Sequence, residues 1–411
     1  MTPALSRFLA PPTRSLESYA RIAICAALAL MGLGVLMVYS ASSAKAGIKY
    51  DDAELFLRRQ LMWVVLGAAT IYVTMRIDPE RLRTYVKPAC IAVLVMLALV
   101  LIPGVGTTTN GASRWFRIGP LSLQPSELAK LCAVVWLAHH MDLARDRLSD
   151  WKTGVLPAVV PIGLAAGLTL VEPDFGTALF LAAVAAAILL VGGMPMKKLA
   201  WSSLAALPLI AWQIAKRWGV MMRRLEGMGG GSANSDATHQ VYQAKVAMGS
   251  GGLTGVGIGA GHQKLFYLPE AHTDFIMGVI GEEMGFLGSM FVLLLFAVIT
   301  WCGFRIAMGL AARSRYTFLF VFGCVFMIGL QAAGNVAVVT GSVPTKGIAL
   351  PFVSLGGSSL LVLCAALGFV YAAARQHDFA VARGDTVPPR PQPSADSAPT
   401  AMATQAASGA A

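Results

Sequence analysis

The chain has 411 residues, of which 56% are hydrophobic and only 13% are charged. Soluble domains carry about 25% charged residues, so this composition excludes an ordinary soluble protein and indicates a protein of the lipid bilayer. The formal net charge is +11, but the basic residues occupy short loops between apolar segments and form no basic cluster interleaved with aromatic residues. This distribution is typical of membrane topology signals, and we expect no nucleic-acid partner.

Apolar segments recur along most of the chain. A helix needs ~20 residues to cross ~30 Å of hydrocarbon, and only a helix satisfies its own backbone in lipid at this length. We therefore predict an all-α polytopic membrane protein, a bundle of ten transmembrane helices. The predicted spans are 20–40, 57–75, 86–103, 126–141, 154–171, 177–193, 199–215, 275–301, 316–340 and 355–374.

The Lys and Arg residues predict the orientation. They are more numerous beside the loops that face inside if the N-terminus is cytoplasmic, so we place both termini in the cytoplasm. Residues 1–18 then form a cytoplasmic tail and residues 19–376 the membrane domain, with 216–274 as a large outside loop between the seventh and eighth helices. Residues 377–411 are rich in Pro, Ala, Ser and Thr and poor in large apolar residues, so we expect a disordered tail.

The first apolar segment begins near residue 19 and is long enough to span, which predicts an uncleaved anchor rather than a signal peptide. The cysteines all lie within or at the ends of apolar segments and form no CxxC pair, so we expect neither disulfides nor a thiolate metal site. They are Cys25, Cys90, Cys132, Cys302, Cys324 and Cys364.

Ionisable residues at membrane depth are costly and therefore indicate function. The fourth span opens with QPSELAK (124–130), in which Ser126, Glu127 and Lys130 share one helical turn and the last two are spaced i, i+3. The alternative is an ordinary helix start with a lysine that extends toward the interface. That alternative explains poorly why Lys130 lies inside the span.

The fifth and sixth predicted spans are joined by EPDFGTA (172–178). Glu172 and Asp174 flank a proline there and could bind a divalent cation or pair with a cation of a neighbouring helix. A solvated turn in which Asp174 caps the next helix is an equally good interpretation.

The segment YLPEAHTDF (267–275) directly precedes the eighth predicted span. It places Glu270, His272 and Asp274 within five residues. A carboxylate at the mouth of the bundle can be partly desolvated, which raises its pKa toward that of a useful general base. Capping by Thr273 or Asp274 is the alternative, but it leaves Glu270 and His272 unexplained, so we favour Asp274 as a functional carboxylate.

The segment VPTKGIALPFVSLGGSS (343–359) joins the last two spans. Lys346 is the only cation of that loop, and the GGSS turn, which includes Ser358, opens the last helix with unpaired amides. An ammonium group and amides suit a phosphate, whereas the alternative is a surface lysine before a Gly-rich helix start. The run GVGIGAG (255–261) looks like a dinucleotide-binding motif but follows no strand, so it is a weak indication.

Acids alone on the outside half would indicate cation transport. Acids together with cations and Gly-rich turns suit a phosphorylated lipid, with a carboxylate as base.

These four motifs resemble those of the SEDS family (shape, elongation, division, sporulation) in order, spacing and placement. The resemblance covers roughly residues 17–376, and PEAHTDF and PTKG are more like the FtsW division branch than the RodA elongation branch. It implies a fold of ten helices and a peptidoglycan glycosyltransferase that polymerises lipid II at the outer face of the bacterial cytoplasmic (inner) membrane, at the division septum. It also implies a class B penicillin-binding protein as transpeptidase partner, alongside other divisome membrane proteins and membrane lipids.

The resemblance also assigns residues. Asp274 matches the essential aspartate, and Glu270 matches a glutamate earlier in the same motif. The substrate-binding residues expected in the cavity are Glu127, Lys130, Glu270, Lys346 and Ser358. The family activity is helped by a divalent cation such as Mg²⁺ or Mn²⁺, for which Asp274, Glu172 and Asp174 are the candidate ligands.

The sequence departs from the family pattern at a few positions. Leu355 stands where tyrosine is expected, Met277 and Gly278 stand where Phe and Ala are usual, and GAGHQK (259–264) is unusual. These departures leave the proposed carboxylates intact. Two other classes of function are alternatives to the enzyme. A lipid II flippase needs polar residues on the inner half as well, and a pure scaffold leaves Lys130 without a purpose, so we rank the enzyme first.

Overall fold

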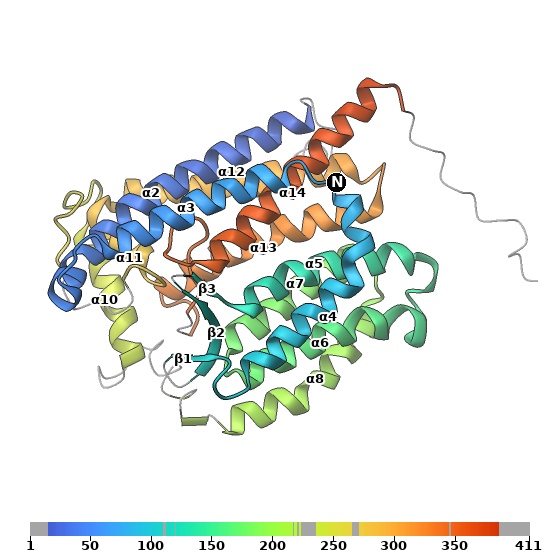
Figure 1. Cartoon of the computed structure of the whole chain (residues 1–411), viewed down its shortest axis with the longest axis horizontal. Helices are drawn as coiled ribbons and strands as arrows, with labels where there is room; N and C mark the ends of the chain where they lie inside the picture. Colours follow the sequence, from blue (N-terminus) through green and yellow to red (C-terminus); the bar gives the residue numbers. More distant parts are fainter. Residues whose placement is uncertain are drawn as a thin grey trace, which may run out of the picture.

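The computed structural model describes residues 15–109, 112–119, 121–216, 218–219, 222, 236–264, 271–344 and 347–385. These residues are mostly helical (Figure 1). The helices are α2 (Leu16–Tyr50), α3 (Leu55–Thr74), α4 (Leu82–Val100), α5 (Pro125–Leu143), α6 (Leu156–Val171), α7 (Phe175–Val191), α8 (Met196–Lys216), α10 (Asp236–Ser250), α11 (Ile276–Glu283), α12 (Gly285–Leu310), α13 (Arg315–Val339) and α14 (Ser358–Ala382). Short helical turns lie at Pro79–Arg81, Arg145–Arg147 and Trp151–Val155.

Each of the ten predicted spans coincides with helical structure. Six helical stretches of the described chain are long and apolar enough to cross a membrane, and Phe175–Val191 is apolar but shorter. The six are Leu16–Tyr50, Pro79–Val100, Trp151–Val171, Gly285–Leu310, Arg315–Val339 and Ser358–Ala382. The chain is thus a helical, multi-pass membrane protein.

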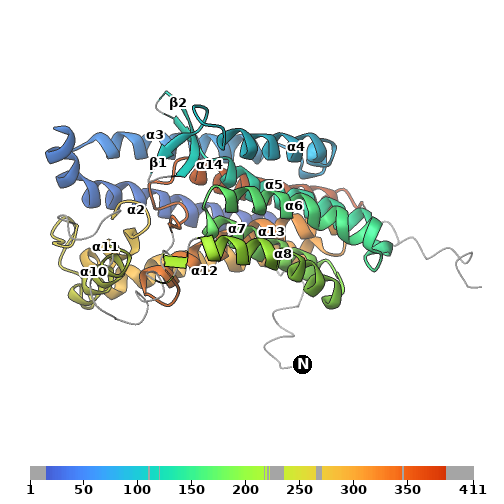
Figure 2. The same cartoon turned by 90° about the horizontal axis from the view of Figure 1, so that it is seen from below.

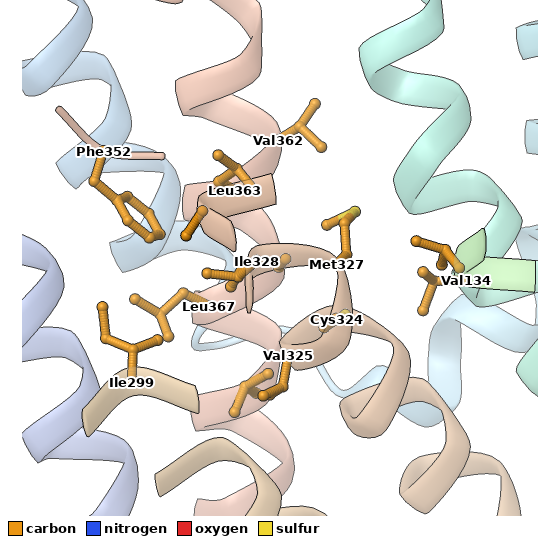
Figure 3. Close-up of a cluster of buried hydrophobic side chains, with 14 of the residues drawn as sticks. Val134, Ile299, Cys324, Val325, Met327, Ile328, Phe352, Val362, Leu363 and Leu367 are labelled. Atoms are coloured by element: carbon orange, nitrogen blue, oxygen red, sulfur yellow. The ribbon is translucent and has the colours of Figure 1, made fainter. Parts of the chain in front are cut away.

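The long helices lie side by side, with α13 and α14 in the middle of the bundle (Figures 1 and 2). Most of the apolar stretch of α14 is buried inside the protein, whereas most of that of α4 is exposed, as expected for a central helix and a peripheral, lipid-facing one. Figure 3 shows the core around α13, where Met327 and Ile328 lie among Val134 of α5, Ile299 of α12 and Leu363 of α14.

The eighth predicted span is not one helix. It is divided at Gly285, where φ is +66° and an added Cβ would lie 2.3 Å from the backbone nitrogen of Gly255. The loop after α10 enters this break: the N–H groups of Phe286 and Leu287 donate to the carbonyls of Gly252 and Leu253, at 2.9 and 3.1 Å. The prediction of a continuous helix over 275–301 is therefore wrong, because the loop supplies the partners that a helix break requires.

The all-α prediction also misses a three-stranded antiparallel sheet between α4 and α5. Its strands are β1 (Thr107–Thr109), β2 (Ala112–Ile118) and β3 (Leu121–Leu123), in the order β1-β2-β3. The segment between α4 and α5 is too short and too polar to span the membrane. Hydrogen bonds between its strands satisfy its backbone N–H and C=O groups. The sheet lies against α4 and α5, and Arg114 donates to the carbonyls of Glu172 and Pro173 in the turn before α7, at 3.0 and 2.6 Å.

The predicted boundaries of the tails need correction. Helix α2 begins at Leu16, and α14 continues to Ala382, so residues 377–382 are helical rather than disordered. The reason is a contact between the two ends of the chain: Asp378 accepts hydrogen bonds from the N–H groups of Leu16 and Glu17, at 3.2 and 2.8 Å. A carboxylate there satisfies amides that α2 leaves without partners at its start. Residues 1–14 and 386–411 lie outside the described residues.

Candidate active site

The segment that contains Asp274 is held in place by hydrogen bonds to three successive backbone carbonyl groups. The carbonyl of His272 accepts from the N–H of Leu355 at 3.2 Å, and that of Thr273 accepts from the hydroxyl of Ser354 at 2.6 Å. The carbonyl of Asp274 accepts from the side-chain amide of Asn335 at 2.8 Å. The carboxylate is thus presented by a backbone that is fixed to α13 and to the loop before α14.

The N-cap position of α11 is occupied by Phe275, which makes no side-chain capping bond. This finding does not support the alternative in which Thr273 or Asp274 is present to cap that helix. Asp274 is part-buried and lies against Gly347: an added Cβ on Gly347 would be 2.9 Å from Oδ2 of Asp274. Any side chain at position 347 would therefore displace the Asp274 carboxylate.

Replacing Gly347 by alanine is expected to displace the Asp274 carboxylate and to lower the rate of the chemical step by roughly 10–100-fold, because small misplacements of reacting groups have effects of this size. Gly163→Ala is a matched control, since an added Cβ there meets nothing within 4 Å. The measurement is steady-state turnover of both variants, and equal rates would contradict the close contact.

A polar cavity of about 40 Å³ lies beside Gly347, with room for about three water-sized groups. It is lined by Glu127 and Lys130 of α5, by Gly176, Thr177 and Phe180 of α7, by Gln331 of α13, and by Gly347, Ile348 and Ala349. Gly347 therefore connects the cavity to Asp274, because it lines the one and contacts the other.

The predicted pair Glu127 and Lys130 is brought together in this cavity. Nζ of Lys130 lies 2.8 Å from Oε2 of Glu127, and both residues are buried. The same ammonium group donates to Oε1 of Gln331 at 3.0 Å and lies 4.9 Å from the ring centre of Phe180. Lys130 thus does not extend to the interface, and the interpretation of QPSELAK as an ordinary helix start fails on this point.

Two residues of the site were not predicted. Gln331 and Asn335 are buried on α13, four residues apart on one helical face. Gln331 donates to the carbonyl of Ala349 at 3.1 Å and to Oγ of Ser359 at 3.2 Å, and Asn335 donates to the carbonyl of Ile348. Two amides spaced i, i+4 in an otherwise apolar span were the signal that could have revealed them.

Ser358 is the first residue of α14, and its Oγ accepts from the backbone N–H of Gln124 at 3.2 Å. It therefore joins the start of α14 to the start of α5, and a role in substrate binding stays a prediction. Glu270 and Lys346 lie outside the described residues.

The three candidate metal ligands do not form one site. Asp174 caps α7, accepting from the backbone N–H of Thr177 at 3.1 Å and from its hydroxyl at 2.8 Å. Within the described ranges there is no group of three or more His, Cys, Asp or Glu side chains that could hold a metal ion. Glu172 is buried, and neither of its carboxylate oxygens has a hydrogen-bond partner within the protein. These residues do not fit a shared cation site.

Burial, reinforced by the charge of Asp174 and opposed by Arg114, raises the pKa of Glu172 to about 8 from its ordinary value of 4.5. The folded protein therefore holds a proton that the unfolded chain releases between these two values. The stability that this proton confers is fully present below about pH 4.5 and is lost as the pH rises through about 8.

We therefore expect the Tm of the wild type to fall between pH 5 and pH 8 and that of Glu172→Gln to fall less, so that the variant gains at pH 8. Each kcal/mol corresponds to roughly 2–4 °C. Thermal unfolding in detergent measures this, with exposed Glu54→Gln as the control. Parallel pH profiles for wild type and Glu172→Gln would rule out the neutral acid.

Comparisons with known proteins agree with this fold. The sequence model of the cell cycle protein family FtsW/RodA/SpoVE matches residues 20–378. The chain belongs to this family. It is 40% identical over 358 residues to a probable peptidoglycan glycosyltransferase FtsW of Trichlorobacter lovleyi, covering 86% of this chain and 93% of that protein. It is 35% identical over 341 residues to stage V sporulation protein E of Bacillus subtilis, covering 83% and 93%.

Solved structures show the same fold. One is described as "structural coordination of polymerization and crosslinking by a peptidoglycan synthase complex". It superposes with a TM-score of 0.68 and 30% identity, covering 86% of this chain and 97% of that one. The rod shape determining protein RodA of Thermus thermophilus superposes with a TM-score of 0.62 and 29% identity, covering 86% and 96%. The sequence-based assignment to this family, and to its FtsW-like members, is confirmed.

The departures from the family pattern are compatible with the site. Leu355 contacts the carbonyl of His272 through its backbone N–H, so the contact does not depend on which side chain is present at position 355. Gly278 lies in α11 against α10, where an added Cβ would be 3.4 Å from Cβ of Ala244. Glycine at 278 thus permits close packing of these two helices.

Proposed function

We propose that the chain is a peptidoglycan glycosyltransferase of cell division that polymerises lipid II, with Asp274 as the general base. The glycosyltransferase activity and its link to division follow from membership of the family and from relatives that bear this name. The observation that supports the residue assignment is the contact of Asp274 with Gly347, which also lines the cavity of Lys130. Gly347 thereby links the proposed proton acceptor to the cavity that contains the cation.

The proposed reaction uses these two groups differently. Asp274 takes the proton from the 4-hydroxyl of the acceptor sugar as its oxygen attacks the anomeric carbon of the lipid-linked donor chain. The bond to undecaprenyl diphosphate breaks with inversion, so no covalent enzyme intermediate forms. The departing diphosphate gains negative charge, and a preorganised cation is an effective way to stabilise it. Lys130 is buried and held by an ion pair with Glu127 and a hydrogen bond to Gln331, so little reorganisation is needed for it to take this role.

The location, topology and partner that we propose for this reaction are those that membership of the family implies. We place the site at the outer face of the cytoplasmic (inner) membrane, at the septum, in a topology of ten spans with both termini inside. The meeting of α2 and α14 through Asp378 supports a common side for the two ends. A class B penicillin-binding protein is the proposed partner, because one similar structure is described as a complex for polymerization and crosslinking. A dependence on Mg²⁺ or Mn²⁺ stays a prediction, to be tested by titrating each ion into the assay.

The test is polymerisation of purified lipid II by the detergent-solubilised protein together with its candidate transpeptidase. We expect long glycan strands on a gel, and none when either lipid II or the protein is omitted. The absence of polymer with the partner and Mg²⁺ or Mn²⁺ supplied would contradict the proposal. A liposome translocation assay would then ask whether the same polar cavity serves a lipid II flippase instead.

A further inference from the structure

The acidic residues at the end of α11 lie outside the proposed reaction, yet they are among the most deeply buried charges of the described chain. Glu282 and Glu283 are 2% and 1% exposed. Nζ of Lys264 lies 2.6 Å from Oε1 of Glu283, and the lysine is also buried. The hydroxyl of Ser40 on α2 donates to Glu283 at 2.7 Å and accepts from Lys264 at 2.8 Å. Three segments distant in sequence therefore meet at one ion pair.

The glycine run before Lys264 is shaped around these carboxylates. The N–H of Gly259 donates to Oε2 of Glu283 at 3.0 Å, and the N–H groups of His262 and Gln263 donate to Oε1 of Glu282, at 2.6 and 3.1 Å. An added Cβ on Gly261 would lie 2.9 Å from Oε2 of Glu282. The GVGIGAG run and the two residues after it thus do provide amides for anions, but the anions are the protein's own carboxylates.

The two residues of the ion pair lie on either side of Asp274 in the sequence. Lys264 precedes Asp274 by ten residues and Glu283 follows it by nine, so their contact closes the segment that carries Asp274 into a loop. Helix α11 has only eight residues, too few to be stable without tertiary contacts. The position of Asp274 therefore depends on the contacts at the ends of this loop as well as on the hydrogen bonds to the carbonyls of His272, Thr273 and Asp274.

We propose that Lys264, Glu283 and Ser40 form a buried clasp that positions Asp274 for the reaction; this inference rests on the proposed function. A buried ion pair is a poor source of net stability, since well-packed apolar residues often serve as well or better. It is, however, geometrically demanding, because each charge is satisfied only in one arrangement. The clasp residues act through Asp274 and are positioning residues, without a role in binding the substrate.

The test compares Lys264→Met, Glu283→Gln and the double variant, each as the full chain with its transpeptidase partner. We expect each single change to lower kcat by roughly 10-fold or more, with KM for lipid II changed less than about threefold. The double variant should lose no more than the worse single variant, because the two residues act as one unit. Lys245→Met, which replaces an exposed lysine of the neighbouring helix α10, is the control and should leave kcat unchanged.

Hydrogen exchange provides a measurement that does not require activity. The amides of Gly259, His262 and Gln263 should exchange faster in Lys264→Met and in Glu283→Gln than in the wild type. If a variant fails to fold, Ser40→Ala is the milder change, for which we expect a loss in kcat of about two- to fivefold. Wild-type kcat in both single variants, losses that multiply in the double variant, or unchanged exchange would each overturn the clasp. A wild type without polymerase activity contradicts the proposed function instead, and the exchange result still decides whether the clasp exists.

Discussion

Asp274→Asn is expected to lower lipid II polymerisation by roughly 10²–10⁴-fold, the range that general-base catalysis contributes. Asparagine has nearly the same shape but cannot accept the proton of the attacking hydroxyl. The fold should be unaffected, because the segment is held through the backbone carbonyls of His272, Thr273 and Asp274, which the substitution leaves in place. The measurement is glycan strand formation from purified lipid II in the presence of the transpeptidase partner.

Asp51→Asn is the matched control for this variant. Asp51 is an exposed carboxylate at the end of α2 with φ of +54°, a conformation that asparagine tolerates well. Its polymerisation should equal that of the wild type. Strands of normal length and yield from Asp274→Asn would show that another group accepts the proton, and the assignment of the base would then be withdrawn.

The parts of the fold that follow from local chemistry could be predicted from the sequence. The length of the apolar segments, together with the need of the backbone for internal hydrogen bonds in lipid, predicted helical structure in every span. The break at Gly285 could not be predicted in this way, because the groups that stabilise it belong to Gly252 and Leu253, more than thirty residues earlier in the chain. The same holds for the helical extension of α14, which depends on the contact of Asp378 with the start of α2.

In the site, too, the features set by local sequence could be predicted and those set by tertiary contacts could not. The pairing of Glu127 with Lys130 follows from their spacing on one helix, and the structure confirms it at 2.8 Å. The shared use of Gly347 by Asp274 and the cavity is a tertiary relation between segments about seventy residues apart, and no local pattern encodes it. The positions of two candidate cation ligands also depend on their surroundings. The spacing of Glu172 and Asp174 suits a ligand pair, but the second residue caps α7 and the first is buried with a raised pKa.

Lys130→Met is the second change for which we expect a large effect, a loss of roughly 10²-fold in polymerisation, comparable to the removal of one electrostatic contact to a developing negative charge. It should also destabilise the protein. Glu127 would be left buried without its cation, and breaking a buried pair in this way costs about 3–5 kcal/mol. A lower rate alone would therefore not distinguish a catalytic role from damage to the fold.

The double variant Lys130→Met with Glu127→Gln separates the two effects. It removes both charges and should recover much of the lost Tm, because a neutral amide is far less costly to bury than an unpaired carboxylate. Polymerisation should remain low, since no cation is available to the departing diphosphate. Lys152→Met, which removes an exposed lysine before α6, should change neither quantity. If the double variant regained the wild-type rate together with its Tm, the charge of Lys130 would serve only to neutralise Glu127, and the diphosphate would have to be stabilised by another group.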